Sequence, residues 1–245
     1  MPTCTPARLA PVTVMPEVLS ENTTPVLDHG FVALDGALAS DLAVVNGARV
    51  SFNQASDELG ERDAGLIGFL MREGHGSPFE HGYFRFIVKA PLFVVREHHR
   101  HRAGHSYNEW SGRYSKMEPE FYVPDYVRSQ VGKPGSYSFE PVDDVTREAA
   151  RREIEENATR AFQAYERMLE QGVAKEVARA VLPLSTYTKY YWSCNPRSLM
   201  HFCSLRNHEA AQFEIQQYAA AAESFLERLM PLTHGAFVKR GRIAP

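Results

Sequence analysis

Residues 96–114 contain an unusual concentration of planar side chains with several hydrogen-bond donors. Four arginines and four histidines fall within these 19 residues. A guanidinium group binds phosphate through two parallel hydrogen bonds and stacks on aromatic rings, which a lysine ammonium does not do. The segment therefore indicates a phosphate or nucleotide site, with a metal site and a solvated helix end as the alternatives. We expect no metal, because neighbouring arginines repel a cation and matched Cys and His pairs are missing.

Three more arginines stand in apolar, helix-like surroundings elsewhere in the chain. They are Arg179, Arg197 and Arg206. One such arginine usually pairs with a carboxylate or extends its charged end to solvent, so alone it says little about a ligand. Together with the 96–114 segment, the three favour one anion-binding pocket built from distant stretches of the chain.

The composition excludes several classes of protein. The chain has 245 residues, of which 44% are hydrophobic and 23% charged, enough for one substantial core. Its net charge of −3 argues against a nucleic-acid-binding protein, and no apolar run is long enough to span a membrane. Three scattered cysteines do not make a disulfide framework. We therefore expect a cytoplasmic protein whose partners include neither nucleic acid nor a membrane.

Periodicity and capping residues predict the elements that position these side chains. Helices are expected over 41–50 after Ser40, 64–73, 91–99, 143–171 and about 209–230, with a further helix starting at Asn195-Pro196. A strand is expected over 83–89, with Lys89 on its exposed side, and another over 121–123, followed by an irregular connection over 124–141. No internal repeat occurs. The pattern predicts a single α+β domain over 27–245, preceded by a poorly ordered extension over 1–26.

The common nucleotide-binding and nucleophile motifs are missing from the chain. It contains no G-x-G-x-x-G, no G-x-x-x-x-G-K-[ST] and no G-x-S-x-G sequence. Composition and spacing alone therefore predict only an anion-binding α+β enzyme.

The segment Arg100-His101-Arg102 to Ser111-Gly112-Arg113-Tyr114 resembles the signature of the flavin-dependent thymidylate synthases, the ThyX family. In that signature, Arg-His-Arg is followed by seven residues and a serine. Segments 47–52, 74–81, 88–122, 176–183 and 187–218 also resemble the family in the same order, so the similarity covers about 27–240. One departure stands out: eight residues separate Arg102 from Ser111, and the extra one falls within 103–105.

The resemblance implies a fold, an activity and a set of ligands. The fold would be a ThyX-like α+β fold, an antiparallel sheet packed with helices in a single oligomeric domain, assembled as a homotetramer with shared sites. The activity would be that of a methyltransferase that converts dUMP to dTMP without a cysteine nucleophile. FAD would be the bound cofactor, NADPH the reductant and methylenetetrahydrofolate the carbon donor.

The resemblance also implies roles for individual residues. Arg206 would activate the uracil, and Ser111 would orient the nucleotide as the second catalytic residue. The implied dUMP contacts are Glu97, His98, His99, Arg100, Glu109, Trp110, Ser111, Gly112, Arg113, Arg179 and Arg206. The implied FAD contacts are Ser77, Glu80, Arg100, His101, Arg102, Asn108, Glu109, Asn195, Arg197 and His201. His201 stands where some relatives have asparagine. Ala210 stands where some have a histidine that contacts the flavin, so this flavin contact is lost here or comes from His208.

The chemistry of uracil methylation can be matched to these residues in two ways. A thiolate could add to C6, but neither Cys194 nor Cys203 has an activating neighbour in the sequence. Arg206 is too basic to accept a proton, yet against N3 and a carbonyl oxygen it would stabilise an enolate-like ring. Two other functions remain open: a flavin or nucleotide enzyme of another reaction class, and a nucleic-acid-binding module that uses the 96–114 segment.

Overall fold

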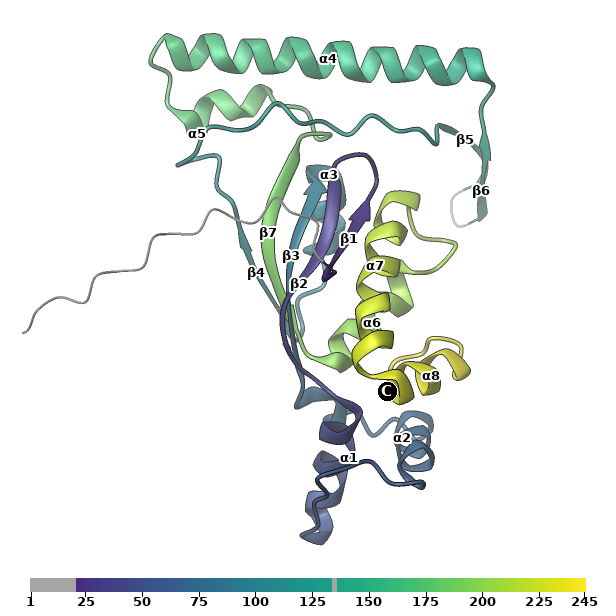
Figure 1. Cartoon of the computed structure of the whole chain (residues 1–245). Helices are drawn as coiled ribbons and strands as arrows, with labels where there is room; N and C mark the ends of the chain where they lie inside the picture. The colour runs from purple at the N-terminus through teal and green to yellow at the C-terminus, as the bar shows by residue number, and fades with distance from the viewer. Residues whose placement is uncertain (1–20, 134–135) are drawn as a thin grey trace, which may run out of the picture.

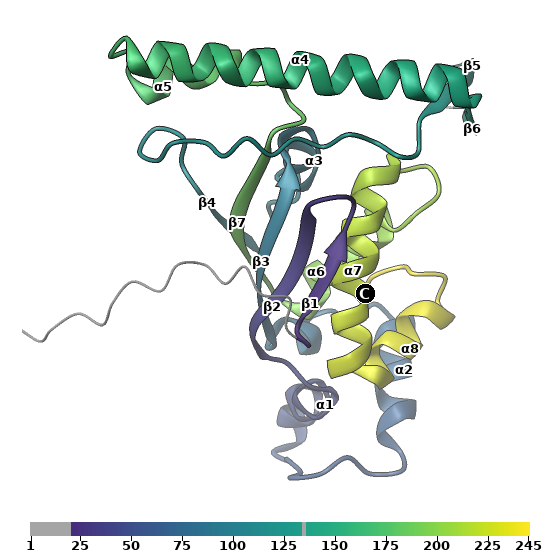
Figure 2. The same ribbon diagram turned by 45° about the horizontal axis from the view of Figure 1, so that its top comes forward.

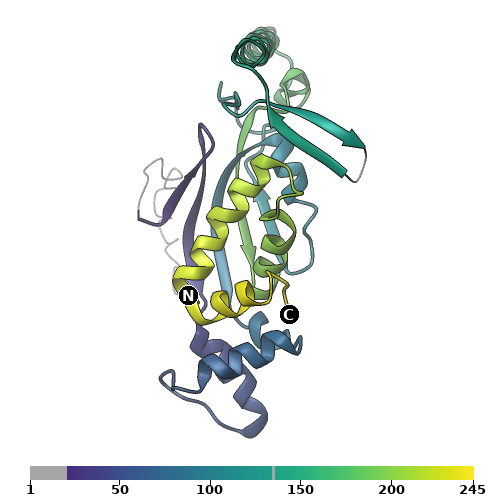
Figure 3. The same cartoon turned by 90° about the vertical axis from the view of Figure 1, so that its right-hand side faces the viewer.

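The computed structural model describes residues 21–133 and 136–245. Its centre is a five-stranded antiparallel sheet with the strand order β1-β2-β3-β7-β4. Helices α6 and α7 lie against one face of this sheet, and α8 packs on α7 and α2 (Asp63–Arg72) beyond its end (Figure 1 and Figure 3). This arrangement confirms the expected α+β fold. The bounds are β1 (Thr23–Val26), β2 (Gly30–Leu38), β3 (Tyr83–Pro91), β4 (His105–Glu109), β7 (Tyr187–Cys194), α6 (Pro196–Arg206), α7 (Phe213–Leu229) and α8 (Pro231–Lys239).

Aromatic side chains fill the space between the sheet and these helices. Phe84 and Phe86 on β3 are fully buried, as is Trp192 on β7. The Phe86 ring lies 4.9 Å from Trp192 and 5.8 Å from Phe225 on α7, measured between ring centroids. Burying a side chain of this size stabilises the fold by about 1.5–3 kcal/mol. The packing therefore fixes α7, and with it the adjoining α6, on the sheet.

Two short helices, α1 (Asp41–Arg49) and α2 (Asp63–Arg72), lie beyond one end of the sheet next to α8 (Figure 1). The Ser40 hydroxyl accepts a hydrogen bond from the Ala43 amide at 3.1 Å, which confirms the expected helix start. The Asp41 carboxylate accepts the backbone amides at the start of α8, from Leu232 at 2.8 Å and Thr233 at 2.9 Å. Short 3₁₀ helices follow α1 and α2, namely η1 (Val50–Phe52) and η2 (Ser77–Glu80).

The long helix α4 (Asp144–Glu170) crosses the other end of the sheet (Figure 2). It begins after Asp143, whose carboxylate accepts the Thr146 amide at 2.9 Å, as the sequence predicted. A small second core packs its C-terminal half: Phe162 and Tyr165 contact a cluster that includes Met117. That cluster holds α5 (Lys175–Ala178) and the 3₁₀ helix η3 (Arg179–Val181) in place.

Several expected elements differ from the structure. Residues 124–141, expected to be irregular, contain the hairpin β5 (Arg128–Lys133) and β6 (Ser136–Pro141). The strand expected over 121–123 is only an isolated bridge between Phe121 and Thr186. The helix expected over 209–230 starts at Phe213, and a separate helix begins at Pro231, where the missing proline N–H breaks the hydrogen-bonding ladder.

Two further findings concern burial and the N-terminal part of the chain. Lys89, expected on the exposed side of its strand, is buried, and its Nζ lies 2.6 Å from Glu120 Oε1. The reason is that β3 is the central strand and is covered on both sides there. Strand β1 falls within the expected extension 1–26, of which residues 1–20 lie outside the described residues. No helix in the described part of the chain is long and apolar enough to cross a membrane.

Candidate active site

Helix α6 carries three of the predicted site residues. It starts as the sequence predicted, with the Asn195 side chain accepting the Ser198 amide at 2.8 Å and Pro196 in the first turn. Its buried side consists of Leu199, Met200, Phe202 and Cys203, which pack into the core. These anchors leave Arg197, His201 and Arg206 with solvent-accessible surface.

The C-terminal end of α6 meets the end of α3 (Leu92–His98) through the Arg206 guanidinium. Its Nε donates a hydrogen bond to His101 Nε2 at 3.0 Å, and its Nη1 lies 3.1 Å from Glu97 Oε2. The side chains of Arg206 and Glu97 retain 24% and 28% of their exposure. Arg206 is therefore held by two acceptors and remains accessible to a ligand. The sequence predicted all three residues as site residues but not their pairing.

Burial sets the charge state of this cluster. It lowers the pKa of His101 to about 4, and the Arg206 guanidinium and the rings of His105 and His201 lower it in the same direction. His101 is therefore neutral near pH 7, with its proton on Nδ1 because Nε2 accepts from Arg206. Burial also raises the pKa of the Glu97 carboxyl, and the nearby Arg206 opposes that shift.

The N-terminal end of α6 meets the loop that contains η2. Arg197 Nη1 lies 2.6 Å from Glu80 Oε1, and Arg197 Nε donates to the Pro245 carbonyl at 2.7 Å. A Cβ atom on Gly76 would overlap the Arg197 guanidinium and lie 2.9 Å from its Nη1, so this close approach needs glycine. Ser77 is exposed beside this contact. The structure thus brings together four of the expected flavin contacts: Ser77, Glu80, Asn195 and Arg197.

The loop with the extra residue, 103–105, packs on the first turn of α6. Gly104 has a φ of +73°, and a Cβ there would overlap Ser198 Oγ, which itself donates to the Ala103 carbonyl at 3.1 Å. The Trp192 indole N–H donates to His105 Nδ1 at 2.9 Å, and the His105 ring lies 5.9 Å from the His101 ring. His105 therefore borders the Arg206 cluster, although it was not among the site residues predicted from the sequence. The eight-residue spacing was the signal that could have indicated it.

A second group of predicted residues lines a small cavity near η3. The Thr188 hydroxyl donates to Glu109 Oε1 at 2.9 Å, and a Cβ on Gly112 would lie 3.3 Å from Arg179 Cδ. Arg113 Nε lies 2.9 Å from Glu176 Oε2, with both side chains about half exposed. The cavity has a volume of about 160 Å³ and is lined by Leu92, Glu109, Trp110, Ser111, Gly112, Met117, Arg179, Leu182 and Thr188.

The predicted arginines do not form a single cluster within one chain. In the part of the chain that the structure describes, no hydrogen bond or ion pair joins the Arg206 cluster to the residues around Arg113 and Arg179. Arg100 and Arg102 are exposed at the turn after α3, and Asn108 is exposed on the edge strand β4. The contacts of the predicted site residues therefore fall into two groups within the described part of one chain.

Two histidines expected at the dUMP site lie partly or wholly in the core. His98 is 1% exposed, stacks on Phe202 at 4.5 Å and has its Nδ1 2.7 Å from the Tyr190 hydroxyl. Its side chain has no surface left for a nucleotide, because α3 turns it toward the sheet. His99 is half-buried against the rings of Tyr107 and Tyr190, and its Nε2 is enclosed without a hydrogen-bond partner.

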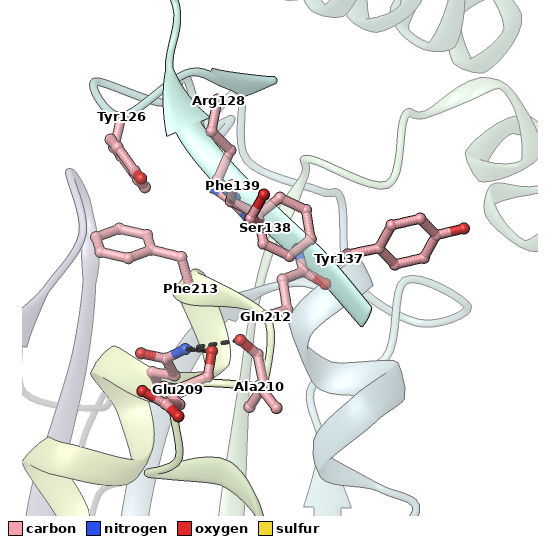
Figure 4. Close-up of a pocket in the computed structure, with 11 residues that line it drawn as sticks. Tyr126, Arg128, Tyr137, Ser138, Phe139, Glu209, Ala210, Gln212 and Phe213 are labelled. Carbon is pink, nitrogen blue, oxygen red and sulfur yellow. Dashed lines mark hydrogen bonds between the residues drawn. The ribbon is translucent and has the colours of Figure 1, made fainter. Parts of the chain in front are cut away.

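A larger cavity of about 780 Å³ lies between the β5–β6 hairpin and the start of α7 (Figure 4). Arg128 reaches into this region, but its two Nη atoms bond both oxygens of buried Glu214, at 3.0 and 2.9 Å. Its charge is therefore already paired, and the rings of Tyr126, Phe139 and Phe213 surround it. Of the positions that the resemblance singled out, Ala210 lines this cavity. The sequence analysis missed the cavity because it did not predict the hairpin.

The cysteines and carboxylates limit the available chemistry. Cys194 and Cys203 are buried, and burial raises the pKa of both thiols well above the ordinary value. Both therefore stay protonated and inaccessible near pH 7, which makes them poor nucleophiles. Among the described residues, no three His, Cys, Asp or Glu side chains are arranged to hold a metal ion.

Comparisons with known proteins agree with the resemblance in the sequence. Residues 34–232 match the family model described as thymidylate synthase complementing protein. The chain is 48% identical over 228 residues to the flavin-dependent thymidylate synthase of Streptomyces coelicolor, covering 87% of this chain and 93% of the relative. The enzyme of the same description from Thermotoga neapolitana is 48% identical over 217 residues, with 88% and 94% covered.

A solved structure shows the same fold. It is the UMP/dUMP methylase PolB from Streptomyces cacaoi bound with 5-Br dUMP, which superimposes with a TM-score of 0.83 at 43% identity. The match covers 91% of this chain and 100% of that one. The chain therefore belongs to the thymidylate synthase complementing family, which comprises the flavin-dependent thymidylate synthases.

Proposed function

We propose that this protein is an FAD-dependent methyltransferase that converts dUMP to dTMP, with methylenetetrahydrofolate as the carbon donor and NADPH as the reductant. The observation that carries the proposal is the Arg206 guanidinium, fixed by Glu97 and His101 yet a quarter exposed. Placed against N3 and a carbonyl oxygen of uracil, such a group stabilises the ring anion that forms when N3 releases its proton to water, and this anion is nucleophilic at C5. No thiolate is needed, in keeping with the buried, protonated cysteines.

The residues around the N-terminus of α6 fit an anionic dinucleotide such as FAD. Gly76 lets backbone and a guanidinium meet closely, and Arg197, Arg100 and Arg102 can donate paired hydrogen bonds to phosphate. The bound flavin supplies the hydride that completes the methyl group. Residues proposed to hold it are Ser77, Glu80, Arg100, His101, Arg102, Asn108, Glu109, Asn195, Arg197 and His201.

The cavity near η3 supports the binding of the nucleotide phosphate. Arg113 is half exposed and, within the described part of the chain, forms an ion pair only with the equally exposed Glu176, so a phosphate can replace that partner at little cost. Arg179 lines the same cavity. Ser111 Oγ accepts the Arg113 amide at 3.3 Å, and no base partner bonds it among the described residues. Ser111 therefore orients the nucleotide and does not act as a nucleophile.

The division of the arginines into two groups supports a site shared between copies of the chain. We propose a cytoplasmic homotetramer in which the Arg113 and Arg179 side of one chain completes the Arg206 side of another. Each half alone lacks either the phosphate contacts or the group that polarises the ring. A site assembled in this way has the four arginines expected at the dUMP site around one nucleotide, namely Arg100, Arg113, Arg179 and Arg206.

Product analysis tests the proposed reaction. Purified protein should show a flavin absorption spectrum, and NADPH with dUMP and methylenetetrahydrofolate should yield dTMP. UMP belongs in the same assay, since the Streptomyces cacaoi neighbour is described as a UMP/dUMP methylase. A colourless protein, or flavin reduction without any dTMP, would contradict the proposal.

Arg206→Ala tests the residue that carries it. The variant should keep its flavin and lose roughly 10²–10³ in turnover, the usual effect of removing a charge that stabilises an oxyanion. Arg72→Ala is the matched control, because Arg72 is exposed on α2 and, among the described residues, contacts only Glu73 and the Phe69 ring. Wild-type turnover by Arg206→Ala would end the assignment.

A further inference from the structure

We propose that His101 is a positioning residue, whose unprotonated Nε2 aims the Arg206 guanidinium at the uracil ring. The proposal rests on the proposed function, because it concerns how Arg206 is held for that reaction. It gives His101 a role beyond contact with the flavin. The geometry that carries it is the 3.0 Å hydrogen bond from Arg206 Nε to His101 Nε2.

Two acceptors restrain the guanidinium at different edges. His101 takes the Nε–H, and Glu97 takes one N–H of Nη1 at 3.1 Å. A guanidinium has five N–H groups, so three donors remain, on Nη1 and Nη2. With Nε and Nη1 both bonded, the plane of the group cannot rotate freely, and the directions of the remaining donors are restricted. A ring that accepts through N3 and a carbonyl oxygen needs two adjacent donors of this kind.

His101 is itself fixed by its surroundings. Its side chain is 7% exposed, and its ring meets Phe202 edge-on at 5.0 Å between centroids. The rings of His105 and His201 lie 5.9 and 6.3 Å away. The packing therefore leaves His101 little freedom to turn its Nε2 away from Arg206. A protonated imidazole has no acceptor, so the hydrogen bond requires the neutral form.

Two substitutions separate the acceptor from the side chain that carries it. Glutamine places its amide oxygen near the position of Nε2, whereas asparagine is shorter and reaches only the position of Nδ1. We expect His101→Gln to form dTMP in a single turnover at least threefold faster than His101→Asn, because only glutamine restores the acceptor. We expect His101→Asn to lose roughly 10- to 100-fold, the equivalent of one hydrogen bond to a charged group. Both rates are measured with saturating FAD and dUMP, and flavin content is determined by absorbance.

The pH profile gives a readout that a merely structural role would not change. Wild-type turnover should fall as the pH drops through about 4, because His101 then becomes protonated and loses its acceptor. Other titratable groups face this cluster, namely Glu97 from α3, His105 from β4 and His201 from α6. Their contributions persist in His101→Gln, so only the part of the acid limb that disappears in this variant belongs to His101. Brief pH jumps, with tryptophan fluorescence to confirm folding, make the measurement possible.

The possible outcomes are distinct. Equal losses in His101→Gln and His101→Asn, or an Asn variant that turns over like wild type, would overturn the proposal. So would a His101→Asn protein that fails to take up flavin while His101→Gln binds it fully, because the acceptor would then serve the flavin. Failure of the wild type to form dTMP would instead overturn the proposed function.

Discussion

Gly76→Ala should weaken flavin binding much more than it weakens the fold. Gly76 has φ −75° and ψ −31°, a conformation that alanine adopts without strain, so the backbone tolerates the change. The added Cβ, however, would overlap the Arg197 guanidinium. That group must move away, and it then loses its bonds to Glu80 at 2.6 Å and to the Pro245 carbonyl at 2.7 Å.

The two effects differ in size. The side chains of Arg197 and Glu80 are each 43% exposed, so their ion pair contributes only about 0–1 kcal/mol to stability. Replacing glycine with alanine stabilises the fold by about 0.4–1 kcal/mol, because alanine restricts the unfolded chain. The net change in the free energy of unfolding should therefore be about 1 kcal/mol or less. A displaced guanidinium loses one or more charge-assisted bonds to the flavin, each about 1.5–3 kcal/mol. The flavin Kd should therefore rise by roughly 10- to 100-fold.

The assay compares three proteins by flavin titration and thermal melting. Gly68→Ala is the matched control, because Gly68 lies within α2 and a Cβ there meets nothing within 4 Å. It should bind flavin like wild type and melt slightly higher, since alanine favours a helix by about 1 kcal/mol over glycine. If Gly76→Ala binds flavin within twofold of wild type, the placement of the flavin beside Arg197 is incorrect.

Two further predictions concern Glu214 and the two buried cysteines. Burial raises the pKa of Glu214, but hydrogen bonds from Arg128 and Gln212 outweigh burial and hold the pKa below its ordinary value. The Arg128–Glu214 pair therefore stabilises the fold above about pH 4.3, and its contribution is lost as the pH falls through the lowered pKa. Glu214→Gln should thus lower the free energy of unfolding by about 3 kcal/mol at pH 7. In urea denaturation at a series of pH values, the variant should lose less stability than wild type as the pH falls below about 4.3; an equal loss in both proteins would contradict this prediction. Cys194→Ala and Cys203→Ala should each cost about 1 kcal/mol and leave dTMP formation per folded molecule within threefold of wild type. Lost turnover in a folded variant would restore a thiolate route.

Elements with local signals could be predicted from the sequence alone. The side chains of Ser40, Asp143 and Asn195 each bond an amide three residues ahead, so the information that starts these helices lies within one turn. The resemblance around Arg100-His101-Arg102 likewise named the family, because a signature is a property of the chain itself. These predictions were confirmed by the fold and by the comparisons.

Most strands could not be predicted in this way. Strand β7 pairs with β3, about a hundred residues away, and with β4 on its other edge. Its run of aromatic residues lies between Pro183 and Asn195-Pro196, but whether such a run forms a strand depends on the partners that the fold supplies. The hairpin β5–β6 was missed because its strands are largely exposed and β5 lacks an alternating apolar pattern, although Ser136–Phe139 in β6 has one.

The sequence alone determined which residue types are available, and only the tertiary structure decided which of them meet. Arg206 and Glu97 are separated by 109 positions, yet their side chains bond because α6 and α3 pack on the same face of one sheet. The same packing buried His98 and divided the arginines between two places in one chain. The chemistry of a side chain depends on its residue type alone. The distances between side chains and their burial depend on how distant segments pack together, so they cannot be derived from any short stretch of sequence.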